Sequence, residues 1–317
     1  MRKVEKNVHQ EEDNSISNSN DIFCQSNVEW NGLYKNESSF KKFVHSSSNK
    51  HPAKMAFRLT EKILQHLEEK NLIDNNTVIV DFMAGSGRTG IISAIRGYKS
   101  ILVELEPNFI EMQKKSIREL ERQVGSARIK IKIFHGDSRY LASLLRDHTA
   151  QDKVGIISPP YEDAEIPVSI PSGTVDEQRS ERQELRSKGE WEGYNRSDTR
   201  NIGNLKEKEY EDAMTEVYSE AKKTGISPLV VVTKNPTRKG KLVDVATITA
   251  NALERAGYEV FDYHRARLFD VSRTQTSKLF PQSQEKTQGR ISFFKRLSMK
   301  KGSVAAEWED IMFAKKI

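Results

Sequence analysis

Cysteine is nearly absent from this sequence, and its scarcity excludes several kinds of site. Among 317 residues the only cysteine is Cys24. One cysteine allows neither an intramolecular disulfide framework nor a zinc cluster built on cysteine thiolates. The seven histidines are scattered along the chain and show no ligand spacing such as His-x-x-x-His. We therefore expect a protein without a metal site.

Long apolar runs are missing as well. No stretch approaches the length of a membrane span, and the N-terminus carries Lys and Arg without the apolar segment of a secretory signal. We expect a cytoplasmic protein that does not bind membranes. The formal net charge is +6, and a basic protein concentrates near phosphate polyanions through counterion release. The charge is thus compatible with a nucleic-acid partner, and it leaves the oligomeric state open.

Aliphatic residues are unevenly distributed. Residues 1–27 are rich in Asn, Ser, Glu and Lys and predict a disordered tail, because such a segment buries too little apolar surface to offset its ordering entropy. We expect one domain over 28–317, with the aromatic residues of 28–43 docked on its core. Within the domain, 162–205 is a polar insertion that is too long for an ordinary connection. Residues 264–302 form a strongly basic segment.

Elsewhere, apolar residues alternate between strand-like runs and helical spacing. The spacing predicts helices over 55–72, 91–96, 108–124, 210–223 and 243–256. Apolar runs predict strands over 78–82, 101–104, 129–134, 154–157, 229–233 and 258–263, and a last antiparallel strand over 311–314. In the third of these strands apolar residues alternate with Lys, which suits the edge of a sheet. The alternation of strands and helices implies an α/β fold with a mostly parallel sheet.

A glycine-rich turn follows the first predicted strand. Its sequence is Asp81-Phe82-Met83-Ala84-Gly85-Ser86-Gly87, and it opens a helix. Glycines allow a sharp turn and a close approach of the backbone to a ligand. Glu104 ends the next strand about 20 residues on, where an acid accepts hydrogen bonds from ribose hydroxyls. A merely structural turn and a solvated carboxylate are the plainer interpretations.

Two cofactor classes use this arrangement, nicotinamide dinucleotides and S-adenosylmethionine. A helix N-terminus favours a pyrophosphate, whereas this loop begins with the acid Asp81. A carboxylate near the loop suits the sulfonium and the α-amino group of S-adenosylmethionine, which has no phosphate. Asp137, after the third strand, either accepts the adenine amino group or caps a helix. The residues favour S-adenosylmethionine.

The tetrapeptide Ser158-Pro159-Pro160-Tyr161 ends the fourth predicted strand. Consecutive prolines lack backbone donors and fix φ, so the strand must end there while the carbonyls remain acceptors. A base amine needs one acceptor for each N–H, and the Ser158 hydroxyl and the Pro159 carbonyl supply two. Tyr161 can stack on the face of an unstacked base. We predict a catalytic site for methylation of an exocyclic amine; the alternative is an ordinary Pro-Pro turn.

In this order the motifs resemble those of the DNA amino-methyltransferases, the family that methylates N4 of cytosine and N6 of adenine. The likeness runs from about residue 51 to 263. In that family a segment resembling His51-Pro52-Ala53-Lys54-Met55 contacts the methionine part of the cofactor. The resemblance implies a Rossmann-like, seven-stranded sheet with helices on both faces, a reversed last strand, and base flipping. Serine at the first position of the tetrapeptide implies N4 of cytosine rather than N6 of adenine.

Basic residues at two places are candidates for nucleic-acid contact. Lys234 follows the fifth strand, at the edge where ligands of parallel sheets bind. Arg290, Lys295 and Arg296 lie in the basic segment, where interleaved phenylalanines suit phosphate contact and base stacking. A turn at Asn235-Pro236 and a solvated basic loop are the alternatives.

The leading hypothesis is a site-specific methyltransferase that modifies N4 of cytosine in double-stranded DNA, in the manner of restriction–modification enzymes. Catalysis then rests on positioning rather than on a covalent intermediate, which agrees with the absence of a usable nucleophilic cysteine. An N6-adenine DNA methyltransferase and an N-methyltransferase of RNA bases, tRNA included, are the alternatives within the same chemistry. A nucleic-acid-binding protein with a vestigial cofactor pocket is the alternative outside it.

Overall fold

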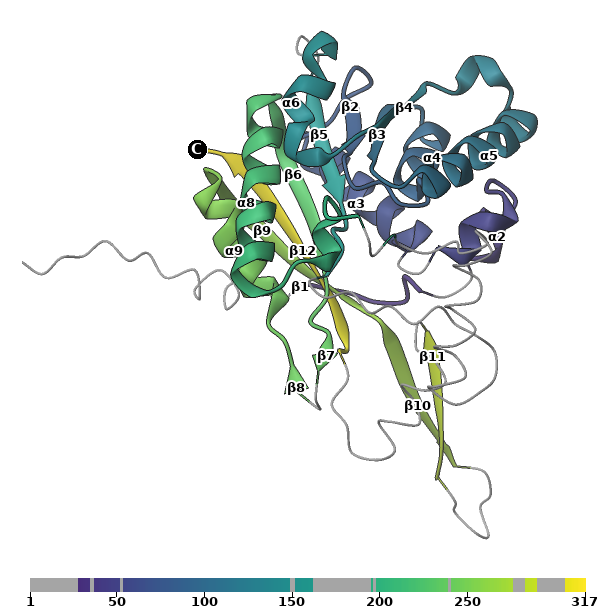
Figure 1. Ribbon diagram of the computed structural model, residues 1–317. Coiled ribbons are helices and arrows are strands. Elements are labelled where there is room, and N and C mark those ends of the chain that lie inside the picture. The colour runs from purple at the N-terminus through teal and green to yellow at the C-terminus, as the bar shows by residue number, and fades with distance from the viewer. Residues whose placement is uncertain are drawn as a thin grey trace, which may run out of the picture.

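The chain folds around one open sheet, seen in the computed structural model of Figure 1. The structure describes residues 28–34, 37–51, 54–148, 152–161, 195, 198–238, 241–275, 283–289 and 306–317. The order of strands in the sheet is β1-β9-β12-β6-β5-β2-β3-β4. In chain order these strands are β1 (Val28–Trp30), β2 (Val78–Asp81), β3 (Lys99–Glu104), β4 (Ile131–His135), β5 (Lys153–Ile157), β6 (Ile226–Thr233), β9 (Tyr258–Arg267) and β12 (Trp308–Lys316).

The sheet is parallel except for one strand. β12 runs antiparallel to both of its neighbours, β6 and β9, as the sequence predicts for the last strand. β4 is the edge strand, which also agrees with its alternating pattern. The predicted α/β, Rossmann-like fold is confirmed. The sheet has eight strands rather than seven, because β1 pairs parallel with β9 and adds a strand at the opposite edge.

Helices cover both faces of the sheet. On one face α6, α8 and α9 pack on a core that includes Val80, Tyr218 and Leu253. On the other face α3, α4 and α5 enclose a second core, to which Trp30 contributes. The bounds of the helices are α2 (Ser38–Lys41), α3 (Phe57–Glu69), α4 (Arg88–Ile95), α5 (Pro107–Val124), α6 (Leu141–Leu144), α8 (Glu207–Lys223) and α9 (Val245–Arg255). Short 3-10 turns are η1 (Ser46–Lys50), η2 (Ser126–Arg128), η3 (Ser138–Tyr140), η4 (Arg146–His148) and η5 (Ile202–Asn204).

Two hairpins extend from the carboxyl ends of strands in the sheet (Figure 1). β7 (Thr237–Arg238) and β8 (Lys241–Leu242) follow the carboxyl end of β6, and β10 (Phe269–Gln275) and β11 (Ser283–Gly289) follow that of β9. β6 and β9 both run antiparallel to β12, so both hairpins leave the sheet at the edge where ligands of parallel sheets bind. Among the described residues, no helix is both long and apolar enough to cross a membrane.

Several expectations concern residues outside those that the structure describes. These are the tail 1–27, the greater part of the insertion 162–205, and the end of the basic segment 264–302. The described end of the insertion contains η5, and the described start of the basic segment contains the last part of β9 and the β10–β11 hairpin. The aromatic segment that begins at Val28 docks as predicted, because Trp30 is buried.

Candidate active site

A cavity lies at the carboxyl ends of β2, β3 and β5. It encloses about 800 Å³ of empty space when the open solvent at its mouth is included. Its walls include most of the residues that the sequence assigns to cofactor binding: His51, Lys54, Asp81, Phe82, Met83, Ala84, Gly85, Ser86, Glu104 and Asp137. Ser158 and Pro160 of the tetrapeptide line the same cavity. The fold thus brings together motifs that are far apart in the sequence.

The glycine loop between β2 and α4 has a backbone that favours glycine. Gly85 has a φ of +50° and Gly87 a φ of +75°, and Gly87 immediately precedes α4. A Cβ atom on Gly85 would lie 2.7 Å from Nε2 of His51. The amide of Gln113 donates to the Gly85 carbonyl at 2.8 Å. The loop therefore passes close to His51 and is held in place from α5.

Glu104 ends β3, and its carboxylate is oriented by the backbone. Its Oε2 accepts the N–H of Gly85 at 2.6 Å, and its Oε1 accepts the N–H groups of Leu105 and Glu106, each at 2.9 Å. Burial raises the pKa of Glu104 to about 7, although the N–H donors act in the opposite direction. The result is an acceptor in the cavity wall that is fixed in place and costly to ionise without a partner.

Asp81 ends β2 and is buried at the start of the loop. Its carboxylate is hydrogen-bonded to the side chain of Thr89 and accepts the backbone N–H of Met83 at 3.1 Å. Burial raises the pKa of Asp81 to about 6, against these two hydrogen bonds. Asp81 and Glu104 therefore give one cavity two carboxyl groups that a cation or a hydroxyl donor would stabilise as carboxylates.

Asp137 does what the plainer interpretation of the sequence expects. Its carboxylate accepts the backbone N–H of Arg139 at 2.9 Å and so caps η3. The Arg139 guanidinium pairs with the same carboxylate, with one nitrogen 2.6 Å from Oδ2. Asp137 still lines the cavity, so contact with an adenine amino group stays a prediction.

The tetrapeptide follows β5 beside the cavity and is hydrogen-bonded to α8. The hydroxyl of Tyr210 donates to the carbonyl of Pro160 at 2.8 Å. η5 packs on the same turn, because a Cβ atom on Gly203 would lie 3.2 Å from Cβ of Pro160. Nζ of Lys234, after β6, lies 5.7 Å from the centre of the Tyr161 ring. Lys234, a predicted nucleic-acid contact, thus lies beside the Ser158–Tyr161 turn.

Some predicted residues do not line the cavity. Gly87, Pro159 and Tyr161 belong to the two turns but are not part of its wall. Pro52 and the basic residues Arg290, Lys295 and Arg296 lie outside the described residues, so their predicted roles are untested.

The structure also adds Glu106 and Arg200, which sequence reasoning missed, and it places Asn201, a residue of a loop that the sequence suggests could close over the base, beside them. The carboxylate of Glu106 is buried and accepts the N–H of Asn195 and the side-chain amide of Asn201, both at 2.9 Å to Oε1. Burial raises the pKa of Glu106, although these donors oppose the shift. Asn201 and Arg200 reach the cavity from the end of the insertion. No spacing signals this contact, because Glu106 and Asn201 are brought together only by the folded chain.

The reversed β12 between β6 and β9, together with the glycine loop and the cavity at the strand ends, defines the Rossmann-like methyltransferase fold class. Sequence comparison agrees with this assignment. The model of the N6_N4_Mtase family, described as DNA methylase, matches residues 2–115 and supports the DNA amino-methyltransferase family that the motifs indicate. The matched range includes the glycine loop and Glu104 but ends before Ser158. No curated protein matches the chain.

Solved structures with a similar arrangement come from several methyltransferases. The precorrin-6y C5,15-methyltransferase of Geobacter metallireducens GS-15 is 11% identical, with a TM-score of 0.40 over 81% of this chain and 87% of that one. A tRNA (uracil-54, C5)-methyltransferase of Pyrococcus abyssi, in complex with S-adenosyl-L-homocysteine, is 10% identical, with a TM-score of 0.37 over 83% and 39%. The geranyl diphosphate C-methyltransferase of Streptomyces coelicolor A3(2) is 9% identical, with a TM-score of 0.41 over 82% and 77%. At these values the likenesses say nothing about the substrate.

Proposed function

We propose that this protein transfers a methyl group from S-adenosylmethionine to N4 of cytosine in DNA, after flipping the base into the cavity. The observation that carries the proposal is that Ser158 and Pro160 line the same cavity as Asp81, Gly85 and Glu104. An amine-holding turn and a candidate cofactor site thus share one space. The match to a DNA methylase family supports the choice of polymer.

The side chains of the cavity fit this cofactor. S-adenosylmethionine supplies a methyl group on a cationic sulfonium, together with an ammonium group and ribose hydroxyls. Glu104 is held by three backbone N–H groups in an orientation suited to accepting hydroxyl donors. Burial raises the pKa values of both Asp81 and Glu104. A ligand with positive charge and hydroxyl donors would stabilise their ionised forms. The carboxylates are thereby selective for such a ligand.

The residues of the turn position the amine. Ser158 and the Pro159 carbonyl accept the two N–H groups of the amine, which directs the nitrogen lone pair toward the cofactor side of the cavity. The Tyr210 hydroxyl fixes the Pro160 carbonyl and with it the turn. Tyr161 stacks on the base, and Lys234 beside its ring contributes positive charge. Catalysis by positioning is sufficient because the cofactor is intrinsically reactive.

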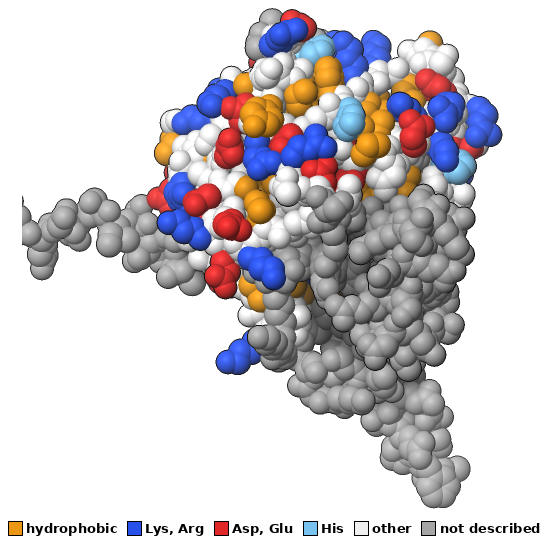
Figure 2. All heavy atoms as spheres, viewed as in Figure 1, with side chains coloured by type: hydrophobic (Ala, Val, Ile, Leu, Met, Phe, Trp, Pro, Cys, Tyr) orange, Lys and Arg blue, Asp and Glu red, His pale blue; other side chains and the backbone are white. Residues whose placement is uncertain are grey.

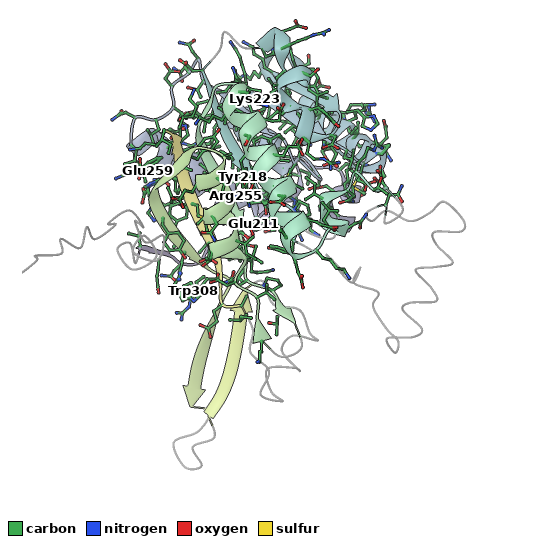
Figure 3. All side chains as sticks on the ribbon, turned by 60° about the vertical axis from the view of Figure 1, so that its left-hand side comes forward. Glu211, Tyr218, Lys223, Arg255, Glu259 and Trp308 are labelled. Carbon is green, nitrogen blue, oxygen red and sulfur yellow. The ribbon has the colours of Figure 1, made fainter. Side chains whose placement is uncertain are left out.

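The nucleic acid approaches the carboxyl edge of the sheet, from which both hairpins extend. The face seen in Figure 2 carries interspersed basic and acidic side chains. Some basic side chains of the helices are paired with acids. Arg255 of α9, for example, binds Glu211 at 2.8 Å and Asp212 at 2.7 Å (Figure 3). A paired arginine contributes less positive charge to a phosphate contact than an unpaired one. The insertion 162–205 and the basic segment 264–302 are our candidates for reading the target sequence.

The test is mass spectrometry of nucleosides from cells that lack base methylation and express either the wild type or Ser158→Ala. We expect N4-methylcytosine in the DNA of the wild type and a lower level of it in the variant. N6-methyladenine instead would overturn the choice of base, and label transfer to tRNA in preference to duplex DNA would overturn the choice of polymer. If a protein that binds the cofactor modifies neither polymer, the proposed activity is wrong.

A further inference from the structure

A cluster of three titratable side chains lies apart from the cavity, on the face of the sheet that α3 covers. It consists of His66 on α3 and of Asp262 and His264 on β9. Asp262 and His264 are two residues apart on one strand, so their side chains leave the same face of the sheet. His66 meets them from the helix above. None of the three lines the cavity of the candidate active site.

The polar atoms of the cluster converge on one point. Nε2 of His66 lies 2.8 Å from Oδ2 of Asp262, and Nε2 of His264 lies 3.2 Å from Oδ1 of the same carboxylate. The two Nε2 atoms are 3.3 Å apart. Ligand atoms bound to zinc at about 2.0–2.1 Å in a tetrahedron are roughly 3.3 Å from one another. The spacing of the cluster is therefore close to that of a zinc site before any movement of its side chains.

The surroundings hold the cluster in this arrangement. Trp30 of β1 stacks on the His264 ring, with centroids 4.6 Å apart and planes 21° apart, and Phe313 packs against both imidazoles. The backbone N–H of Tyr263 donates to Oδ1 of Asp262 at 2.9 Å, as an outer partner does for a ligating carboxylate. The two histidines are nearly buried, whereas the Asp262 side chain is 20% exposed and leaves a path from solvent.

We propose that His66, Asp262 and His264 bind one divalent first-row metal ion through three protein ligands, with Zn²⁺ as the probe and a water molecule in the fourth position. Such an ion would link α3 to β9 next to Trp30 of β1, and would thereby stabilise this side of the sheet. The sequence predicts no metal site because it has no histidines at short ligand spacing. This cluster has no such spacing, because His66 and Asp262 are 196 residues apart. Nδ1 of His264 is buried and meets no hydrogen-bond partner among the described residues. Because histidine ligands usually have such a partner, we expect weaker binding than at a complete zinc site.

The experiment titrates the metal-free, full-length protein with Zn²⁺ by calorimetry and, in parallel, with Co²⁺ by visible absorption, with Mg²⁺ as the ion that nitrogen ligands disfavour. Asp262→Asn keeps the shape of the side chain and an oxygen for the Tyr263 N–H, and His66→Gln removes a ligand from the helix. His148→Gln changes a half-buried histidine of η4 and serves as the control for adventitious binding. Cooperative thermal unfolding of each variant establishes that it is folded.

We expect one Zn²⁺ per wild-type chain, a higher melting temperature with Zn²⁺ than with Mg²⁺, and d–d bands of bound Co²⁺. Since loss of an outer partner costs about 10–100-fold in affinity, loss of a direct ligand should weaken binding at least about 100-fold in Asp262→Asn and His66→Gln. His148→Gln should bind like the wild type. The proposal is wrong if the wild type binds no Zn²⁺, or if both ligand variants bind it as tightly as the wild type. These outcomes do not depend on methyl transfer.

Discussion

The carboxylate of Glu104 accepts the backbone N–H of Gly85 at 2.6 Å, so the acidic end of β3 is bonded directly to the glycine loop that follows β2. The bond joins two motifs that sequence analysis could only place near each other. It also gives Glu104 two tasks, because the same carboxylate shapes the loop and faces the cavity. Removing its charge should therefore affect both the shape of the loop and ligand binding.

Glu104→Gln should weaken the binding of S-adenosylmethionine about tenfold to hundredfold, the effect of losing about 1–3 kcal/mol of hydrogen bonding to a charged acceptor. The glutamine amide would bring N–H donors toward the backbone N–H groups that now bind the carboxylate. Calorimetry of cofactor binding measures the effect. Glu111→Gln, which changes an exposed glutamate of α5, is the control and should bind like the wild type. Equal affinities in both variants would remove Glu104 from the site.

Cofactor binding should strengthen as the pH rises from 5.5 to 8. In the protein without cofactor, burial raises the pKa of Glu104 to about 7 and that of Asp81 to about 6. The unfolded chain ionises nearer pH 4, so the stability that these groups contribute is complete below that pH and is lost as the pH rises through 6 and 7. A ligand that requires both carboxylates ionised then gains up to about tenfold in affinity per pH unit for each group.

Calorimetry across this pH range measures the dependence. Above pH 8 the affinity should reach a plateau, because both groups are then ionised without the ligand. In Glu104→Gln the part of the dependence centred near pH 7 should disappear while the part near pH 6 remains. An affinity that is constant from pH 5.5 to 8 in the wild type would show that neither carboxylate ionises on binding.

Ser158→Ala should slow methyl transfer about tenfold to hundredfold while leaving the cofactor affinity unchanged, since it removes one acceptor of the target amine and about 1–3 kcal/mol of positioning energy. Ser158→Asp restores an acceptor and should recover part of the rate. Single-turnover transfer from labelled cofactor to cytosine-containing duplexes measures both. Ser143→Ala, on the exposed side of α6, should leave the rate as it is. A wild-type rate in Ser158→Ala would exclude the hydroxyl from holding the amine.

The sequence predicts every strand of the main sheet except β1. Strands such as Val78–Asp81 and Lys153–Ile157 are buried along their whole length, and a continuous apolar run reveals them. β1 has only three residues, of which Trp30 alone is buried, so no periodicity can develop. α4 begins at Arg88, before its predicted start at 91, because Gly87 already turns the chain with a positive φ. Local turn geometry of this kind is not contained in an apolar pattern.

The site shows the same division. Motifs within one segment, such as the glycine loop and Ser158-Pro159-Pro160-Tyr161, are recognisable because their residues are adjacent in the chain. Glu106, Asn201 and Tyr210 act across the fold, through hydrogen bonds between residues that are distant in the chain. The two interpretations of Asp137 could not be separated from sequence, since a helix cap and a ligand contact need the same carboxylate.

Lys234→Gln should raise the KM for DNA and reduce the salt dependence of binding by about one unit of slope, the effect of losing one phosphate contact. Its Nζ lies 5.7 Å from the Tyr161 ring, at the edge where the nucleic acid is expected. Cofactor affinity should not change. Lys223→Gln changes a lysine at the C-terminal end of α8 that is paired with Glu220. This variant is the matched control. Binding isotherms at several salt concentrations distinguish the two, and identical slopes would exclude Lys234 from phosphate contact.

Tyr210→Phe tests whether the turn is held from α8. The variant loses the hydrogen bond from the phenol to the Pro160 carbonyl, which is 2.8 Å long. Tyr258→Phe loses a hydrogen bond of the same kind and length, to the carbonyl of Ile226 at the opposite edge of the sheet. Each change should lower the free energy of unfolding by about 0.5–1.5 kcal/mol.

Only Tyr210→Phe should slow methyl transfer, because only Tyr210 positions the residues that hold the amine. We expect a several-fold lower single-turnover rate at saturating cofactor, with unchanged cofactor affinity, whereas Tyr258→Phe should react at the wild-type rate. Denaturant unfolding establishes that the two variants are destabilised to a similar extent. If both variants lose the same fraction of activity, the hydroxyl of Tyr210 contributes to stability alone, and the geometry of the turn must be maintained by the two prolines and by the packing of η5 against them.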